Sequence, residues 1–197
     1  MHGLVNRAIE RFVRDSYGTE AWRAVTRRAG LEMTSFEAML AYDDKLTEDL
    51  LGAIAAHLEK PRDEVLEDIG TYLVSHPNLE ALRRLLRFGG VTFVDFLHSL
   101  DDLPGRARLA VEDLELPRLE LRDHAANLFS LLCRSRYHGF GHVMMGVLRA
   151  LADDYGALVL LEYGAASDGA EVICITLIES AYAEGRTFDL GGRTALG

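Results

Sequence analysis

The stretch PRLELRDHAANLFSLLCRSRYHGF, from Pro117 to Phe140, marks the place where the spacing of the apolar residues changes. Upstream, apolar residues recur every three or four positions, as in Leu4 to Val13, and this spacing predicts amphipathic helices. Inside the stretch, Leu119 and Leu121 alternate with charged residues, which is typical of a half-buried strand, and 127–136 is a second strand candidate. The chain therefore passes from helices to strands at Pro117.

The elements on either side of this stretch follow the same two spacings. Upstream we predict helices that end at Tyr17-Gly18 and Gly30, a helix capped by Thr47, one that begins at Pro61, one over 78–88 and one capped by Thr92. Downstream we predict a helix over 139–155 and two strands, 157–163 and 171–179, joined by the turn-rich Ala165-Ala166-Ser167-Asp168-Gly169. A run of helices followed by mostly antiparallel strands indicates an α+β fold.

Length and charge narrow the class of protein. A chain of 197 residues can bury one full hydrophobic core, and 49% apolar with 26% charged residues is ordinary for a globular domain. The net charge is -10 and no basic tract is present, so we expect neither nucleic acid nor an anionic membrane surface as a partner. No apolar run reaches the roughly 18 residues of a membrane span, and we expect a cytoplasmic protein.

Side chains able to do chemistry are scattered rather than grouped. Cys133 and Cys174 lie in apolar stretches, where we expect two reduced, buried thiols rather than a disulfide. His138 and His142 have the spacing of two ligands on one helix face, but without a paired donor we expect both to be exposed. The acidic pairs are expected to be turn or helix-cap residues; they are Asp43-Asp44, Asp101-Asp102 and Asp153-Asp154. No cluster supports an enzyme.

A series of short motifs runs in order along almost the whole chain. It comprises Met1-His2-Gly3-Leu4-Val5-Asn6, Tyr42-Asp43-Asp44, the segment FLHSLDDL from Phe96 to Leu103, Pro117 and Gly139-Phe140. This series resembles the haem nitric-oxide/oxygen-binding (H-NOX) family. The resemblance implies a helical amino-terminal subdomain packed on a carboxy-terminal subdomain with a four-stranded antiparallel sheet. We therefore expect one domain over residues 1–184, divided into 1–60 and 61–184, and a flexible Gly-rich tail at 185–197.

The resemblance also implies a ligand site and a partner. In H-NOX proteins haem lies between the two subdomains, a histidine ligates its iron and a Tyr-x-Ser-x-Arg motif binds its propionates. Binding of NO or oxygen changes the iron–histidine bond and shifts the two subdomains. A partner histidine kinase or cyclase responds to this shift. The positions that match the family's apolar haem cavity are Leu4, Val5, Leu73, Phe96, Leu100, Leu103, Pro117 and Met144.

The ligand positions depart from the family pattern. Pro104 stands where the ligand histidine is expected; proline offers no donor atom, and we expect it to end or kink its helix. In the propionate motif Cys133 replaces the tyrosine, Ser135 is kept and Tyr137 replaces the arginine. The neighbouring arginines are expected to face away, because strand side chains alternate. Cys133 and His76 are the remaining candidates for a substitute iron ligand, and we expect no other metal site.

These departures predict a sensory or regulatory module that acts by protein contact and whose haem ligation has degenerated. Haem is its cofactor by resemblance only, because the ligand histidine is missing. Three alternatives remain open. The chain could be a haem-based NO or oxygen sensor with a substitute axial ligand, a carrier of another tetrapyrrole or apolar ligand, or a scaffold with a solid interior.

Overall fold

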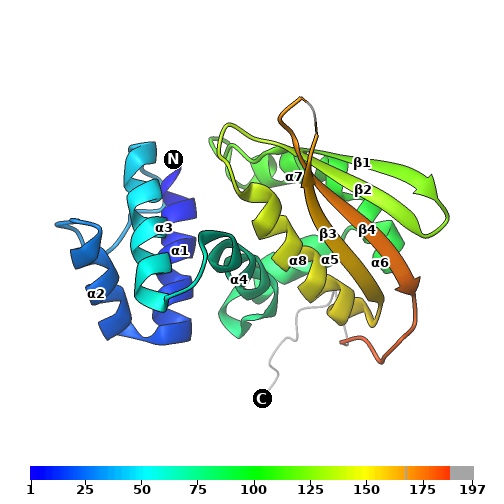
Figure 1. The fold of residues 1–197 in the computed structure, drawn as a ribbon, viewed down its shortest axis with the longest axis horizontal. Coiled ribbons are helices and arrows are strands. Elements are labelled where there is room, and N and C mark those ends of the chain that lie inside the picture. The colour runs from blue at the N-terminus through cyan, green and yellow to red at the C-terminus, as the bar shows by residue number, and fades with distance from the viewer. Residues whose placement is uncertain (167, 187–197) are drawn as a thin grey trace, which may run out of the picture.

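The amino-terminal half of the molecule is helical. The computed structural model describes residues 1–166 and 168–186, so most of the expected tail at 185–197 lies outside the described residues. Helices α1, α2 and α3 form one group, and α4 stands between this group and the rest of the molecule (Figure 1). Their bounds are, in order, Gly3–Tyr17, Thr19–Arg28, Asp44–Leu58 and Arg62–Ser75.

The carboxy-terminal half combines helices with an antiparallel sheet. Its helical elements are η1 (Pro77–Leu79), α5 (Glu80–Arg87), α6 (Phe93–His98), η2 (Leu100–Asp102), α7 (Leu103–Ala110) and α8 (Phe140–Tyr155). Its strands are β1 (Arg118–Ala125), β2 (Leu128–Arg134), β3 (Leu158–Ala165) and β4 (Glu171–Glu179). The sheet has the order β1-β2-β4-β3, and each neighbouring pair is antiparallel. The predicted α+β fold is therefore confirmed. Among the described residues, no helix combines the length and apolarity needed to cross a bilayer.

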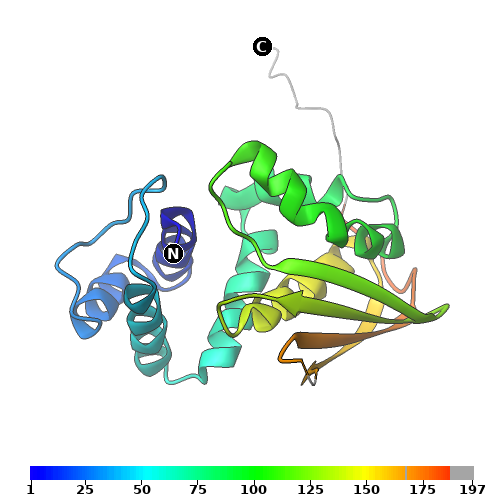
Figure 2. The same ribbon diagram turned by 90° about the horizontal axis from the view of Figure 1, so that it is seen from above.

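Each half has its own hydrophobic core. In the amino-terminal core, Trp22, Phe36 and Ile54 are buried together with Val65 and Ile69 of α4. In the carboxy-terminal core, alternate residues of β2 and β4 pack against α6, α7 and α8; these strand residues are Phe129, Leu131, Cys133, Ile173, Ile175 and Leu177. The helices of this core lie on one face of the sheet, and the opposite face is turned away from them (Figure 2).

The two halves meet where α4 crosses α8. A Cβ atom added at Gly70 would lie 2.0 Å from the backbone oxygen of Val143, and one added at Gly146 would lie 2.0 Å from the backbone oxygen of Glu67. The two helix backbones are therefore in contact, and only glycine leaves room for this approach. Because α4 packs against both halves, it connects their two cores. The expected subdomain boundary between residues 60 and 61 stays a prediction.

The start of α3 differs from the prediction. The helix begins at Asp44, and the Asp43 side chain accepts a 2.8 Å hydrogen bond from the backbone N–H of Lys45. Thr47 is therefore not the cap. It is buried inside the helix, where its hydroxyl donates a 2.7 Å hydrogen bond to Oδ1 of Asn6. Thr92, by contrast, caps α6 as predicted, in a reciprocal pair with Asp95.

Pro104 does not end or kink a helix. The preceding helix, α6, already ends at His98, and a short 3-10 turn follows it. Pro104 then lies in the first turn of α7, where the backbone N–H that proline lacks would have no helical partner. The proline is compatible with this backbone, and it starts a helix.

Candidate functional site

A cavity of about 810 Å³ opens between the loop that follows α7 and the loop that follows β2. This volume falls within the roughly 300–1,000 Å³ of small-molecule pockets. Three of the predicted site residues, Pro117, Ser135 and Tyr137, line it. The other lining residues are mostly charged; they are Arg108, Glu112, Asp113, Leu114, Glu115, Leu116, Arg134 and Arg136. This cavity is the part of the predicted site that the structure brings together.

The arginines beside this cavity are held by acidic partners. Arg136 lies 3.4 Å from a carboxylate oxygen of Glu115, and its guanidinium lies 4.6 Å from the centroid of the Tyr137 ring. Arg134 donates a 2.6 Å hydrogen bond to Asp168 in the β3–β4 turn. The wall is thus polar, whereas pockets for flat apolar molecules are lined mainly by hydrophobic side chains.

Tyr137 links the cavity to the amino-terminal half. Its hydroxyl donates a 2.9 Å hydrogen bond to Asp44 at the start of α3. Burial, reinforced by this bond, raises the pKa of Tyr137 above its usual value, so the phenol stays neutral. The amino group of Met1 and the Tyr137 hydroxyl hold the pKa of Asp44 below its usual value. The residue that replaces the expected propionate-binding arginine therefore makes a contact between the two halves.

Apart from Pro117, the predicted apolar residues do not line this cavity, and most of them lie in or against the two cores. The carboxy-terminal core contains Phe96, Leu100, Leu103, Cys133 and Met144. Val5 and Leu73 pack against the amino-terminal core, Leu4 is half-buried on α1, and Pro104 is buried on α7. The structure thus divides the predicted set between two cores. A role of these residues in ligand binding stays a prediction.

Neither candidate substitute ligand, Cys133 or His76, lines the cavity beside Tyr137. Burial, reinforced by the charge of Glu171, raises the pKa of the Cys133 thiol to about 12, so the thiolate that binds metals is not formed at neutral pH. His76 accepts a 3.3 Å hydrogen bond from the backbone N–H of Asn78, and its ring lies 3.8 Å from Asp15. Over the described residues, no group of three or more His, Cys, Asp or Glu side chains could hold a metal ion.

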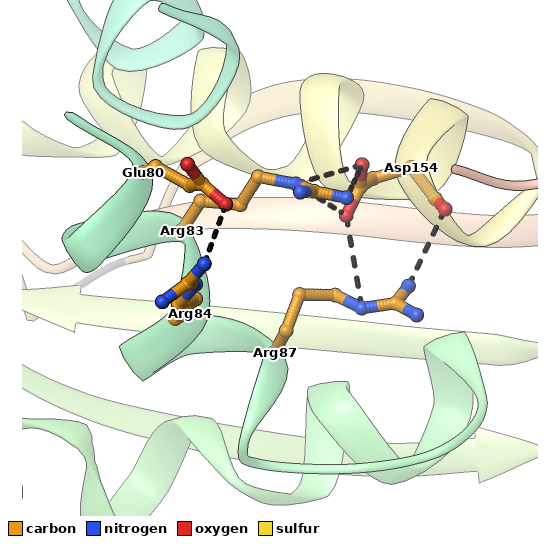
Figure 3. A network of polar contacts seen from close by, with 5 residues as sticks. All are labelled: Glu80, Arg83, Arg84, Arg87 and Asp154. Carbon is orange, nitrogen blue, oxygen red and sulfur yellow. Dashed lines mark hydrogen bonds and ion pairs between the residues drawn. The ribbon is translucent and has the colours of Figure 1, made fainter. Parts of the chain in front are cut away.

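A buried cluster of charges joins α5 to the end of α8 (Figure 3). The Asp154 carboxylate accepts hydrogen bonds of 2.7, 3.0 and 3.1 Å from Arg83, and its backbone carbonyl accepts one of 3.3 Å from Arg87. The Arg87 guanidinium also lies 3.7 Å from the centroid of the Tyr155 ring. The Asp154 side chain is only 2% exposed. The expectation that Asp154 is a turn or cap residue is therefore wrong.

The observed exposure of His142 and Cys174 corrects two further expectations. His142, expected to be exposed, has a side chain that is 12% exposed and stacks on Tyr163 with 4.0 Å between ring centroids. Its two ring nitrogens lie 3.4 Å from Glu67 and 3.6 Å from Asp63, so α4 carboxylates surround it. Cys174, expected to be buried, is exposed, and its thiol is free.

Comparison with known sequences agrees with this architecture. The sequence pattern of haem-NO-binding (HNOB) proteins matches residues 2–162. Soluble guanylate cyclase 89Db of Drosophila melanogaster is 24% identical over 163 residues, which are 83% of this chain and 24% of the cyclase. Soluble guanylate cyclase gcy-31 of Caenorhabditis elegans is 26% identical over 154 residues, which are 78% of this chain and 22% of the cyclase. The chain thus spans about a quarter of the length of these relatives.

Solved structures share the fold. The Fe(II) unliganded H-NOX protein from K. algicida has a TM-score of 0.78 at 18% identity, with 93% of this chain and 100% of that chain covered. An H-NOX protein from S. oneidensis in the Fe(II) ligation state has a TM-score of 0.77 at 16% identity, covering 95% of this chain and 100% of that one. The H-NOX domain is a haem-based gas-sensor module of soluble guanylate cyclases and bacterial sensors. Because the sequence pattern covers most of its length, this chain belongs to the haem-NO-binding (H-NOX) family.

Proposed function

We propose that this chain is a sensory or regulatory H-NOX module that signals by protein contact and does not hold haem through an iron–histidine bond. The proposal is supported by Pro104, which the family resemblance aligns with the ligand histidine and which is buried in the first turn of α7. An imino acid has no donor atom for iron. The Cys133 thiol is protonated at neutral pH, and neither Cys133 nor His76 lines the cavity beside Tyr137.

The propionate end of the site supports the same proposal. The family's arginine and tyrosine bind two carboxylates through charge-assisted hydrogen bonds, which are the strong ones in proteins. Here Cys133 lies inside the core, and the Tyr137 hydroxyl is engaged with Asp44. Haem would therefore lack both its iron ligand and its carboxylate anchor, while the cavity that remains beside Tyr137 has a charged wall.

Signalling would use the contacts between the two halves. These contacts are the α4–α8 crossing and the hydrogen bond from Tyr137 to Asp44. A ligand or partner shifts the halves only if it binds their two arrangements with unequal affinity. The family's domains pair with cyclases or histidine kinases, so we propose a signalling enzyme of one of these kinds as the partner. The net charge of -10 favours a basic docking face on it.

Haem titration of three proteins tests this proposal. Wild type is compared with Pro104→His, which supplies a donor atom, and with Pro104→Ala, the matched control that removes the proline without supplying one. We expect wild type and Pro104→Ala to bind haem alike and weakly, and Pro104→His to bind at least about tenfold more tightly. Equal binding by all three variants would contradict the assignment of Pro104 to the ligand position.

Tight binding of one haem per chain by wild type, with a side chain coordinated to its iron, would contradict the proposed loss of haem ligation. In that case Cys133→Ala and His76→Ala identify the substitute ligand, because loss of the coordinated-iron spectrum in one of them marks the donor. Circular dichroism of each variant controls for loss of the fold.

A further inference from the structure

The sheet face that is turned away from the helices carries exposed apolar side chains. Leu128 is 41% exposed, Leu160 is 50% exposed and Ile178 is 58% exposed, and Cys174 is exposed on the same face. When one face of an antiparallel sheet meets water, that face is usually polar. Exposed apolar patches on soluble domains mark contact sites. This outer face, defined by the outward residues of all four strands, therefore has the character of an interface.

One row of the outer face crosses all four strands and ends in opposite charges. The register pairs Arg122 with Ser130, Ser130 with Cys174, and Cys174 with Glu162. Because strand side chains alternate and the neighbours of Ser130 along β2 point into the core, this row points outward. His124 of β1 lies over Ser130, with 2.8 Å between its Nε2 and the Ser130 Oγ, and leaves Ser130 only 6% exposed. A cation thus lies on edge strand β1, an anion on edge strand β3, and two small side chains between them.

The charges at the two ends of this row differ in how they are satisfied. Arg122 lies 2.8 Å from Glu120 on its own strand, in a pair that is largely exposed to water. Over residues 1–166 and 168–186, the Glu162 side chain forms no hydrogen bond or ion pair. The β3 edge therefore offers a carboxylate to a cation from outside the chain.

We propose that this face binds the same face of a second copy of the chain, around a two-fold axis parallel to the strands and between β2 and β4. Such an axis lays β1 of one copy over β3 of the other. Arg122 then faces the partner's Glu162, and by symmetry this pair forms twice. In the next row, Leu128 faces the partner's Thr176, because the register aligns Leu128, Thr176 and Leu160.

The charges select this axis over its alternative. An axis perpendicular to the strands would lay β1 over β1 and bring two copies of Arg122 together, and like charges in facing positions are destabilising. The parallel axis instead gives an isologous interface with an apolar centre and a charged rim, which is the usual arrangement of protein interfaces. Sheets stacked face to face lie about 10 Å apart, which is within reach of arginine and glutamate side chains.

Sedimentation velocity over a concentration series tests the proposal. Wild type is expected to sediment as a dimer of its 21.9 kDa chain at the upper concentrations. Glu162→Arg and Arg122→Glu each turn two attractive pairs into two repulsive ones, so each should weaken the dimer at least about tenfold. The double variant, with both substitutions, should regain most of the lost affinity. Glu32→Arg, an exposed site of equal charge change in the amino-terminal half, should have no effect.

Two results would overturn the proposal. If the wild-type chain stays monomeric up to about 100 μM, this face does not bind a second copy of the chain. A dimer that is insensitive to both charge reversals would place its interface elsewhere. Cross-linking with a short bis-maleimide gives an independent readout, since Cys174 is exposed and Cys133 is buried. Cross-linked dimer should form in wild type and be lost in Cys174→Ser.

Discussion

Asp154 carries a negative charge at a position where a lone carboxylate would be unstable. Its side chain is 2% exposed, and it lies in the last turn of α8, where the helix carbonyls disfavour an anion. Arg83 and Arg87 offset both effects from α5 (Figure 3). The Asp154 carboxylate therefore links α8 to α5 through ion pairs, and this link needs the charges of Asp154, Arg83 and Arg87.

Neutralising this carboxylate should destabilise the fold strongly. We expect Asp154→Asn to lower the free energy of unfolding by about 3 kcal/mol, because it leaves two largely buried guanidinium groups without their counter-charge. Asp153→Asn is the matched control, because Asp153 is the exposed neighbour of Asp154 and the substitution removes the same charge. It should change the free energy of unfolding by less than about 0.5 kcal/mol. Urea unfolding followed by circular dichroism measures both; equal effects would contradict a structural role for the Asp154 charge.

Whether the role of a single residue can be assigned from the sequence depends on how far along the chain its contact partners lie. Pro104 is assigned to the ligand position because the adjoining segment FLHSLDDL fixes the alignment within a few residues, and this assignment stays a prediction. The roles of Asp154 and His142 could not be assigned in this way, because Arg83 lies 71 residues from Asp154 and Glu67 lies 75 residues from His142. Only folding brings these pairs together, and no spacing of residues in the local sequence predicts them.

At the scale of elements, the α4–α8 crossing determines how the halves are joined. Gly70 and Gly146 let the two helix backbones touch. Each glycine costs helix stability relative to alanine, by roughly 1 kcal/mol. The close approach of the two helices offsets this loss of helix stability, because it lets α4 pack against both cores without a gap.

A methyl group at this crossing should force the helices apart. Gly146→Ala is expected to cost about 3 kcal/mol of unfolding free energy, since its Cβ would meet the backbone oxygen of Glu67. Gly52→Ala is the matched control on α3, where no atom lies within 4 Å of the added Cβ. It should stabilise the protein by up to about 1 kcal/mol. Thermal unfolding of both variants measures the difference, and a neutral Gly146→Ala would contradict close packing at the crossing.

Periodicity predicted the elements better than their ends. The strand 171–179 and the helix capped by Thr92 are observed as expected. The start of α3 was missed because the segment Tyr42 to Asp49 offers several capping side chains in succession. Which of them caps depends on Asn6, a distant residue that holds Thr47 inside the helix. Of the candidate site, the sequence identified three residues of the cavity, and its charged wall appears only in three dimensions.

At the scale of the whole molecule, the chain has the H-NOX fold, and we propose that the chemistry between its halves differs from the family pattern. The two cores, the shared α4 and the covered sheet face keep the halves in place. We propose that Pro104 occupies the ligand position; Tyr137, at the position expected for the propionate-binding arginine, donates a hydrogen bond to Asp44. We therefore propose that the fold transmits a shift between its halves without an iron–histidine bond.

The absorption spectrum of the full chain, purified from cells supplied with haem, tests this central claim most directly. Pyridine haemochrome analysis of the same sample gives the amount of haem per chain. Because Pro104 has no donor atom for iron and the Cys133 thiol is protonated, we expect no stoichiometric Soret band and no spectral change on addition of NO. A Soret band corresponding to one haem per chain, with its iron held by a side chain of this protein, would contradict the account.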